Sequence, residues 1–130
     1  NLPSNVKTCI EDCGYTSAWD EFAYQLKKIS HLPPFPILYV ADWITRIRGG
    51  FAFKDADPLK AVQHSHIPIL FIHGTKDDFV PTYMVYKLYH YANYPKQLLL
   101  IEGGEHATAR CKDPELYFST LKQWIDTYAL

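Results

Sequence analysis

The stretch IPILFIHGTKDDFVP, residues 67–81, decides how this sequence is expected to fold. Its first part is a short run of β-branched, aliphatic and aromatic residues, which is typical of a strand buried on both faces. The run stops at Gly74, and two acidic residues, Asp77 and Asp78, follow within a few positions. We therefore expect a buried strand that delivers acids to the loop at its carboxyl end, the edge where open α/β sheets bind ligands.

A second unit of the same kind follows in the stretch QLLLIEGGEH, residues 97–106. An apolar run again ends in glycine, at Gly103 and Gly104, and His106 lies just beyond it. An acid and a histidine at the same edge of neighbouring strands are two of the three members of a hydrolytic triad.

The remaining elements alternate in a way that predicts an α/β fold. Strands are expected over residues 5–10, 67–73 and 96–102, with residues 11–14 as the turn that ends the first strand. Helices are expected after Ser17, over residues 37–47, 58–63 and 82–92, and after Pro114, with Ser17, Asp57 and Asp113 as N-caps. The order implies parallel strands joined by right-handed crossover helices in three layers.

Composition limits the function classes that are open to the chain. Its 130 residues, 48% of them hydrophobic, fit one globular domain. The 13 basic and 14 acidic residues are interspersed, so nothing points to nucleic acid or an anionic membrane as partner. Three cysteines, Cys9, Cys13 and Cys111, form an odd set without paired Cys-x-x-Cys units, which favours free thiols in a reducing, cytoplasmic compartment. The localisation is otherwise unknown, and a preceding signal or anchor segment stays open.

The pattern His73-Gly74-x-x-Asp77-x-x-Val80-Pro81, followed by a Gly-Gly-x-His unit at residues 103–106, resembles the C-terminal part of the α/β-hydrolase family. It is most similar to serine esterases and peptidase-like members. The resemblance implies a partial α/β-hydrolase fold with a small, lid-like helical insert. Residues 16–64 would form this insert at the border of the substrate pocket, and residues 65–130 would carry the acid and the histidine.

The resemblance also implies roles for individual side chains. Asp77 occupies the position of the triad acid and His106 that of the general base, and no cofactor or metal is implied. Asp78 is the second candidate for the acid, and Asp12 is the third because some family members place the acid after that strand. The alternative interpretations are turn carboxylates and a solvated loop histidine. His73 is expected to have a structural role.

Aromatic residues in and near the insert are candidates for the wall of the pocket. Packing in the interior is the alternative explanation for each of them, because aromatic residues at helical spacing are usually buried. The candidates are Tyr15, Trp19, Tyr39, Trp43, Phe51 and Phe79.

A nucleophile is not evident in the sequence. The Gly-x-Ser-x-Gly elbow of the resembled family is absent, Ser17 is better explained as a helix cap, and Cys13 lacks an identified base. The pair His64 and His66 lacks a third metal ligand at suitable spacing. We therefore expect the C-terminal piece of a longer serine hydrolase that acts on an ester, thioester or small amide. These 130 residues would be catalytically inactive alone and would need the N-terminal half of the longer protein to supply the serine.

A non-catalytic alternative stays open. The chain could be a binding or self-associating module on a hydrolase-like scaffold, because fold alone does not fix function. A truncated parallel sheet would expose an edge strand and apolar surface, which predicts association of isolated chains with one another. The expected partners are thus a small acyl substrate, the N-terminal half, and further copies of the chain.

Overall fold

The computed structural model describes residues 3–93 and 95–130 of the chain. Within this part, one parallel sheet of three strands has the order β1-β2-β3. The strands are β1 (Cys9–Asp12), β2 (Ile69–Gly74) and β3 (Lys96–Ile101). Ile10 of β1 pairs with Leu70 of β2, which pairs with Gln97 of β3. The sheet is parallel because each connection between its strands contains helices that return the chain to the same end.

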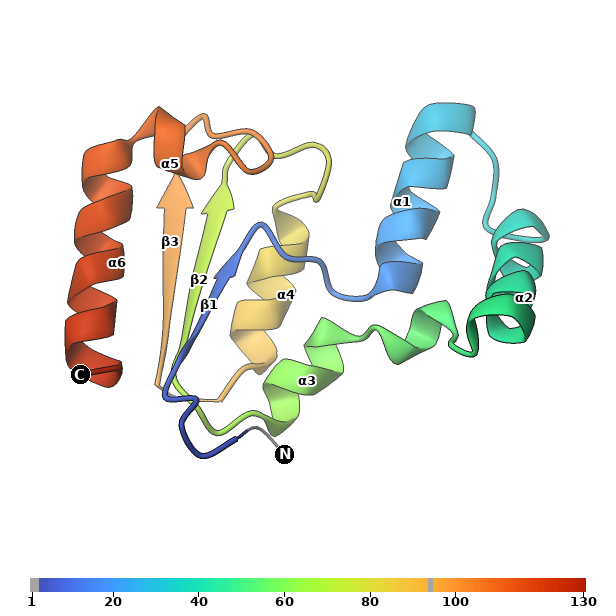
Figure 1. Cartoon of the computed structure of the whole chain (residues 1–130). Helices are drawn as coiled ribbons and strands as arrows, with labels where there is room; N and C mark the ends of the chain where they lie inside the picture. The colour runs from blue at the N-terminus through green and yellow to red at the C-terminus, as the bar shows by residue number, and fades with distance from the viewer. Residues whose placement is uncertain (1–2, 94) are drawn as a thin grey trace.

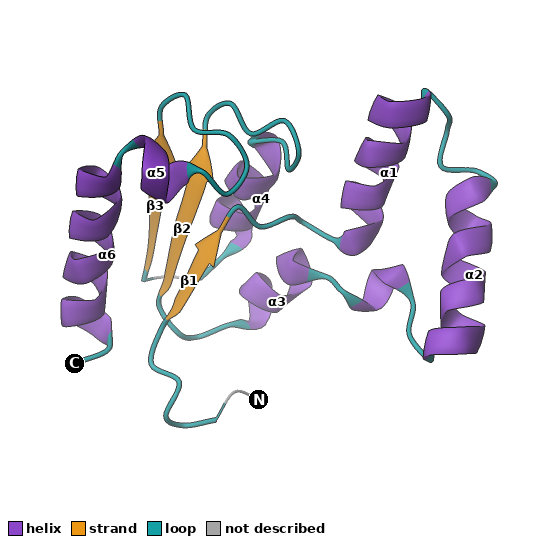
Figure 2. Cartoon of the chain, turned by 45° about the horizontal axis from the view of Figure 1, so that its top comes forward, coloured by secondary structure: helices purple, strands orange, loops and turns teal. Residues whose placement is uncertain are grey.

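Helices cover both faces of this sheet, which confirms the expected three layers (Figures 1 and 2). Two lie on one face and two on the other, while the first two helices lie to one side of the sheet. In the part of the chain that the structure describes, no helix combines the length and the apolar character that a membrane span requires. The helices are α1 (Ala18–Ser30), α2 (Ile37–Gly49), the 3-10 helix η1 (Phe53–Asp55), α3 (Pro58–His64), α4 (Tyr83–Tyr91), α5 (Ala109–Lys112) and α6 (Pro114–Tyr128).

The central strand β2 is buried along its whole length, as its continuous apolar run predicts. Alternate side chains point to opposite faces of the sheet. Leu70 and Ile72 pack in a cluster with Trp124 of α6, whereas Phe71 packs with Val85 and other residues of α4 on the opposite face. Because both faces of β2 are covered, its carboxyl end is a fixed platform for the loop that follows.

The expected helix caps are confirmed. Ser17 accepts a hydrogen bond from the backbone N–H of Asp20 at 3.0 Å. Asp57 and Asp113 each precede a proline at the start of a helix, and each carboxylate accepts the backbone N–H three residues later. Each cap satisfies a backbone donor that the first turn of the helix leaves without a partner.

The position expected for the first strand is wrong by several residues. The strand was expected over residues 5–10 and the turn over residues 11–14, but β1 is Cys9–Asp12. Glu11 and Asp12 pair with Phe71 and Ile72 of β2, so backbone pairing extends the strand through two residues of low strand propensity. The short helix α5 was also not expected from the sequence.

The helices α1 and α2 lie side by side next to the sheet (Figure 1). Phe22 packs on Phe53 of η1 with ring centroids 4.7 Å apart, and Trp19 packs on Tyr39 at 4.9 Å. These apolar residues of α1 therefore face α2 and η1 instead of the sheet. The residue of α1 that is most buried is an acid, Glu21.

Candidate active site

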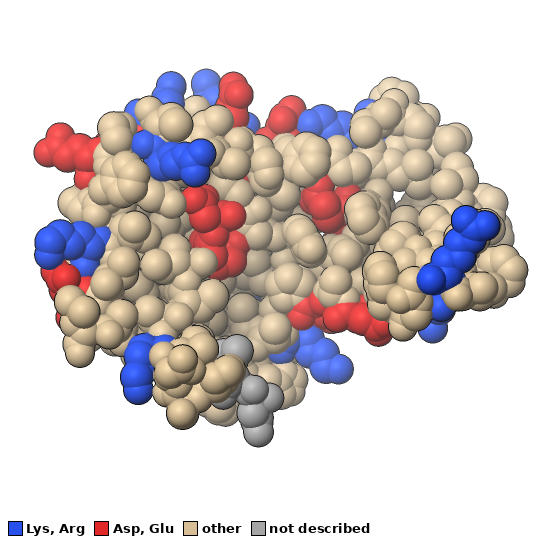
Figure 3. All heavy atoms as spheres, in the orientation of Figure 1, with Lys and Arg blue, Asp and Glu red and all other residues tan. Residues whose placement is uncertain are grey.

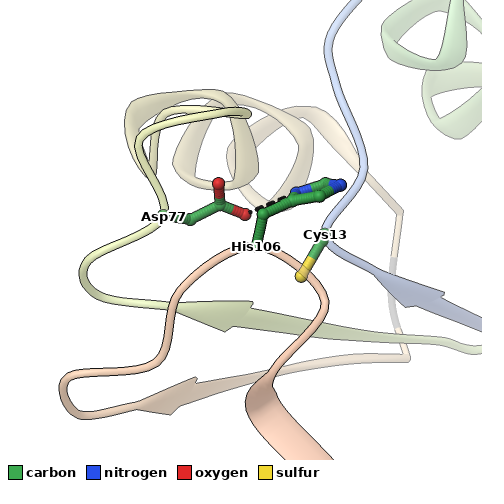
Figure 4. Close-up of side chains that lie close together, drawn as sticks. All are labelled: Cys13, Asp77 and His106. Carbon is green, nitrogen blue, oxygen red and sulfur yellow. Dashed lines mark hydrogen bonds and ion pairs between the residues drawn. The ribbon is translucent and has the colours of Figure 1, made fainter.

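The loops that follow the three strands meet at the carboxyl edge of the sheet. They carry Cys13 directly after β1, Asp77 after β2 and His106 after β3 (Figure 4). Parallel strands end at the same edge, so residues far apart in the sequence become neighbours there. Figure 4 shows the Asp77 carboxylate directed at the ring of His106, with the thiol of Cys13 nearby.

Asp77 is held in one orientation by the backbone of its own loop. Its Oδ1 accepts hydrogen bonds from the backbone N–H groups of Phe79 at 3.0 Å and Val80 at 2.9 Å. The residue is only 5% exposed, so these bonds are shielded from competition by water. The second oxygen, Oδ2, is left to face the neighbouring loop.

His106 binds this second oxygen. Its Nδ1 lies 2.9 Å from Asp77 Oδ2, and because an ionised carboxylate only accepts, Nδ1 carries the proton and donates. The ring also packs on Phe79 at a centroid distance of 4.8 Å. Figure 4 shows the other ring nitrogen, Nε2, pointing away from Asp77. This tautomer leaves Nε2 as an acceptor for a proton.

His73 stabilises the loop that carries Asp77. It is fully buried at the end of β2, and its Nε2–H donates to the carbonyl of Val80 at 2.9 Å. The same nitrogen lies 3.4 Å from Asp77 Oδ2. Its Nδ1 has no hydrogen-bond partner among the described residues. These contacts agree with the structural role expected from the sequence.

Cys13 holds the loop of His106 against the end of β1. Its sulfur accepts the backbone N–H of Ala107 at 3.4 Å and donates to Asp12 Oδ1 at 3.2 Å. Burial is the largest of the effects that raise the pKa of this thiol to about 12. The group therefore stays protonated at neutral pH, which argues against a thiolate nucleophile here.

The same side chains are the one metal-like cluster found in the described ranges. Ligand atoms of Cys13, Asp77 and His106 all lie within 4.8 Å of one another. A metal would need the deprotonated thiol and would compete with the proton on His106 Nδ1. A protonated thiol and an imidazole already hydrogen-bonded to Asp77 are poor ligands for a metal ion.

The other two candidate acids have different partners. The Asp78 carboxylate lies 2.9 Å from Nζ of Lys28 in an exposed ion pair, and Lys28 holds its pKa below the ordinary value. Asp12 accepts the hydroxyl hydrogen of Tyr117 at 2.8 Å. Of the three acids considered, Asp77 is the one that is hydrogen-bonded to His106.

A cavity of about 520 Å³ opens beside His106. Of the aromatic residues expected to line a pocket, Tyr15 and Phe79 line this cavity. The other four candidates, Trp19, Tyr39, Trp43 and Phe51, are not among the residues that line it. Trp19 packs on Tyr39, whereas the side chains of Trp43 and Phe51 are 62% and 53% exposed.

Sequence reasoning missed several residues of this cavity. Glu21, Phe22 and Gln25 of α1 line it, as does Cys13. Glu21 and Gln25 are one helical turn apart, a spacing that places them on one face, but this polar face resembled an ordinary solvated surface in the sequence. Only the docking of α1 onto the acid loop identifies it as part of a cavity wall.

Three further contacts fix α1 onto that loop. Tyr24 and Lys28 donate to the carbonyl of Asp78, at 3.2 and 2.6 Å, and Gln25 donates to the carbonyl of Phe79 at 2.6 Å. In the view of Figure 3, acidic and basic side chains are scattered over the surface of the molecule. On the face drawn there, neither sign of charge gathers into a large patch.

Several known proteins are similar to this chain in sequence or in fold. No protein-family model matches the chain. The chain is 33% identical over 117 residues to the uncharacterized protein YqkD of Bacillus subtilis. The matched region covers 90% of this chain and 38% of YqkD. It is 49% identical over 45 residues to the uncharacterized protein YfhR of Escherichia coli, covering 35% of the chain and 16% of YfhR. The chain thus spans well under two thirds of the length of these relatives.

Solved structures define the class of fold. The esterase Pf2001 of Pyrococcus furiosus matches with a TM-score of 0.63 and 18% identity over 94% of this chain and 46% of its own. An esterase of Thermogutta terrifontis matches with a TM-score of 0.56 and 12% identity over 92% of this chain and 56% of its own. An acylaminoacyl peptidase of Pyrococcus horikoshii also matches with a TM-score of 0.56, at 16% identity over 93% of this chain and 19% of its own. The chain has an α/β-hydrolase fold, and the expected fold class is confirmed.

Proposed function

We propose that this chain is the acid- and base-bearing C-terminal part of a serine hydrolase that cleaves an ester, thioester or small amide. In this proposal Asp77 orients and stabilises the ring of His106, and Nε2 of His106 takes the proton from a serine hydroxyl. The observation that carries the proposal is the 2.9 Å hydrogen bond from His106 Nδ1 to the buried Asp77 carboxylate. It fixes the tautomer in which the second nitrogen is a base.

The serine is proposed to come from residues outside the 130 printed here. None of Ser4, Ser17, Ser30, Ser65 and Ser119 lies in a Gly-x-Ser-x-Gly elbow. β1 is an edge of the sheet and pairs on one side only, with β2, in the part of the chain that the structure describes. A further strand could pair with its free side and deliver a nucleophile to the same edge as His106. The acyl substrate would occupy the cavity beside the His106 ring.

The test is labelling with a fluorophosphonate, which reacts with activated serines. The complete polypeptide translated from the reading frame that contains this chain should be labelled on one serine, whereas the 130 residues alone should not react. His106→Ala should reduce the rate of labelling by about a hundredfold or more, the usual contribution of a general base. His66→Ala removes an exposed imidazole from the loop that precedes β2, at the end of this strand opposite to the site, and should leave the rate unchanged. Equal labelling of the wild type and His106→Ala would contradict the proposal.

Self-association is a second candidate function, and one observation favours it. The outer face of α2 carries apolar side chains that are about half exposed, a patch of the kind that marks interaction sites. Association of two copies through this face would cover it and would leave the cavity beside His106 unoccupied. The residues of this face are Ile37, Tyr39, Val40, Trp43, Ile44 and Ile47.

A further inference from the structure

The cavity beside His106 has mostly apolar walls and one buried acid. Tyr15, Phe22 and Phe79 contribute aromatic side chains to the wall. Glu21 reaches the same cavity from α1, and it is only 6% exposed. No lysine or arginine belongs to the described lining residues. A carboxylate in such surroundings is costly unless a hydrogen-bond donor or a cation meets it.

The carboxylate of Glu21 is only half satisfied. Its Oε1 accepts a hydrogen bond from Gln25 Nε2 at 2.8 Å. Its Oε2 is buried and has no hydrogen-bond partner among the described residues. Gln25 cannot turn to serve both oxygens, because the same amide nitrogen also donates to the carbonyl of Phe79 at 2.6 Å. One carboxylate oxygen therefore lacks a donor.

The nearby cation does not meet this need. Lys28, two turns further along α1, forms its ion pair with Asp78. Burial is the largest of the effects that raise the pKa of Glu21, and the hydrogen bond from Gln25 is the main effect that opposes the rise. Among the described residues, no cation or further donor meets the second carboxylate oxygen of Glu21.

We infer that Glu21 binds a protonated primary amine of the substrate, so that the preferred substrates are small esters or amides that carry an ammonium group. This inference rests on the proposed function, since it names the substrate class of the same site. An ammonium supplies an N–H donor and a positive charge at once, and its bond to a carboxylate is stronger than one between neutral groups. The aromatic walls add favourable contacts for a cation.

The geometry requires only a small adjustment. The last torsion of a glutamate side chain is soft, so the carboxylate can rotate. One oxygen can keep the bond to Gln25 while the other turns towards the amine. The aromatic residues then enclose the carbon chain between the amine and the acyl group beside His106.

Binding can be tested without turnover, on the 130-residue chain itself. The probes are 3-phenylpropylammonium and its neutral counterpart 3-phenylpropan-1-ol, titrated at pH 7.5 and followed by the amide NMR shifts of cavity residues. We expect the amine to bind about tenfold more tightly than the alcohol, as one charge-assisted hydrogen bond predicts. The trimethylated amine, which has the charge but no N–H, should lose much of this advantage.

Two variants locate the effect. Glu21→Gln keeps the size of the side chain and should abolish the preference for the amine. Asp78→Asn removes an exposed carboxylate that does not line the cavity and should leave the preference intact. The inference is overturned if the amine binds no better than the alcohol to the wild type, or if the preference survives in Glu21→Gln. Because no step of hydrolysis is measured, absence of fluorophosphonate labelling would overturn the proposed function and leave this result standing.

Discussion

Gly74 and Gly104 touch through their backbones at the carboxyl edge of the sheet. A Cβ on Gly74 would lie 2.2 Å from the carbonyl oxygen of Gly104, a distance that no real Cβ can adopt. The two loops are joined further by the N–H of Lys76, which donates to the carbonyl of Gly104 at 2.9 Å. This contact is what brings the loop of Asp77 against the loop of His106.

Gly74→Ala should therefore separate the two loops. The clash is with backbone, which cannot rotate away as a side chain can, so we expect a loss of several kcal/mol in the free energy of unfolding. Gly104→Ala is the graded control, because its Cβ would lie 3.2 Å from Gly74 Cα and needs a shift of only tenths of an ångström. Urea denaturation of both variants gives the comparison, and equal losses would contradict this account.

Asp77 and Asp78 are adjacent acids that should behave very differently. Asp77→Asn removes the acceptor that fixes the His106 tautomer, and the amide could present an N–H towards the ring. We expect a loss of about three to four orders of magnitude in the labelling rate of the complete polypeptide, as for other triads. Asp78→Asn removes an exposed ion pair and should change the rate by less than about twofold. A strong effect of Asp78→Asn on the labelling rate would contradict the assignment of the acid role to Asp77.

Tyr117 connects α6 to the end of β1. Its hydroxyl donates to Asp12 at 2.8 Å, and burial is the main effect that raises the pKa of Tyr117 to about 12. Tyr117→Phe keeps the packing of the ring and leaves one carboxylate oxygen of Asp12 without this donor. Because Asp12 is exposed and water can replace the lost donor, we expect a loss of about 0.5 to 1.5 kcal/mol in the free energy of unfolding. Ser119→Ala, on the exposed side of α6, should lower the free energy of unfolding far less. Equal losses in the two variants would show that the hydrogen bond from Tyr117 to Asp12 contributes little.

Glu11 should make the protein less stable as the pH rises. Burial is the largest of the effects that raise the pKa of this carboxyl from 4.5 to about 7, and it outweighs the lowering effect of the backbone N–H of Gly14. The folded state therefore holds the proton more tightly than the unfolded state between these two values, and stability falls as the pH rises through them. From pH 5.5 to pH 8 the expected loss is about 2 kcal/mol, from 1.36 kcal/mol per pKa unit.

Urea denaturation at the two pH values measures this effect. Glu11→Gln has no ionisation at this position, so the pH dependence of its unfolding free energy should be weaker than that of the wild type by that amount. Glu102→Gln, an exposed acid after β3, is the matched control and should keep the wild-type dependence. An unchanged dependence in Glu11→Gln would contradict the assignment.

The apolar outer face of α2 predicts association of the isolated chain. Sedimentation at increasing concentration should show a species larger than the 15.1 kDa monomer. Trp43→Glu places a charge in the centre of this face, on a side chain that is 62% exposed, and should favour the monomer. Lys60→Glu changes an exposed charge on α3, away from this face, and should leave the degree of association unchanged. A wild type that stays monomeric at every concentration would exclude self-association through α2.

The sequence by itself determined the features that depend on local order. The uninterrupted apolar run of β2 can only be stable in the interior, and the Asp-Pro starts of α3 and α6 satisfy their own backbone donors within one turn. The sequence also predicted that Asp77 and His106 lie at one edge, since both follow buried parallel strands. The buried strand and the helix starts need only the spacing of neighbouring residues, whereas the shared edge follows from the expected parallel order of the strands.

Only the tertiary structure decided the rest. The pairing of β1 with β2 carries Glu11 and Asp12 into a strand against their propensity. The docking of α1 on the acid loop turns the polar side chain of Glu21 into a buried wall of the cavity, while Trp19 and Tyr39 pack on each other. The burial and the partners of a side chain depend on segments far away in the sequence, and local pattern contains no information about which segments will meet.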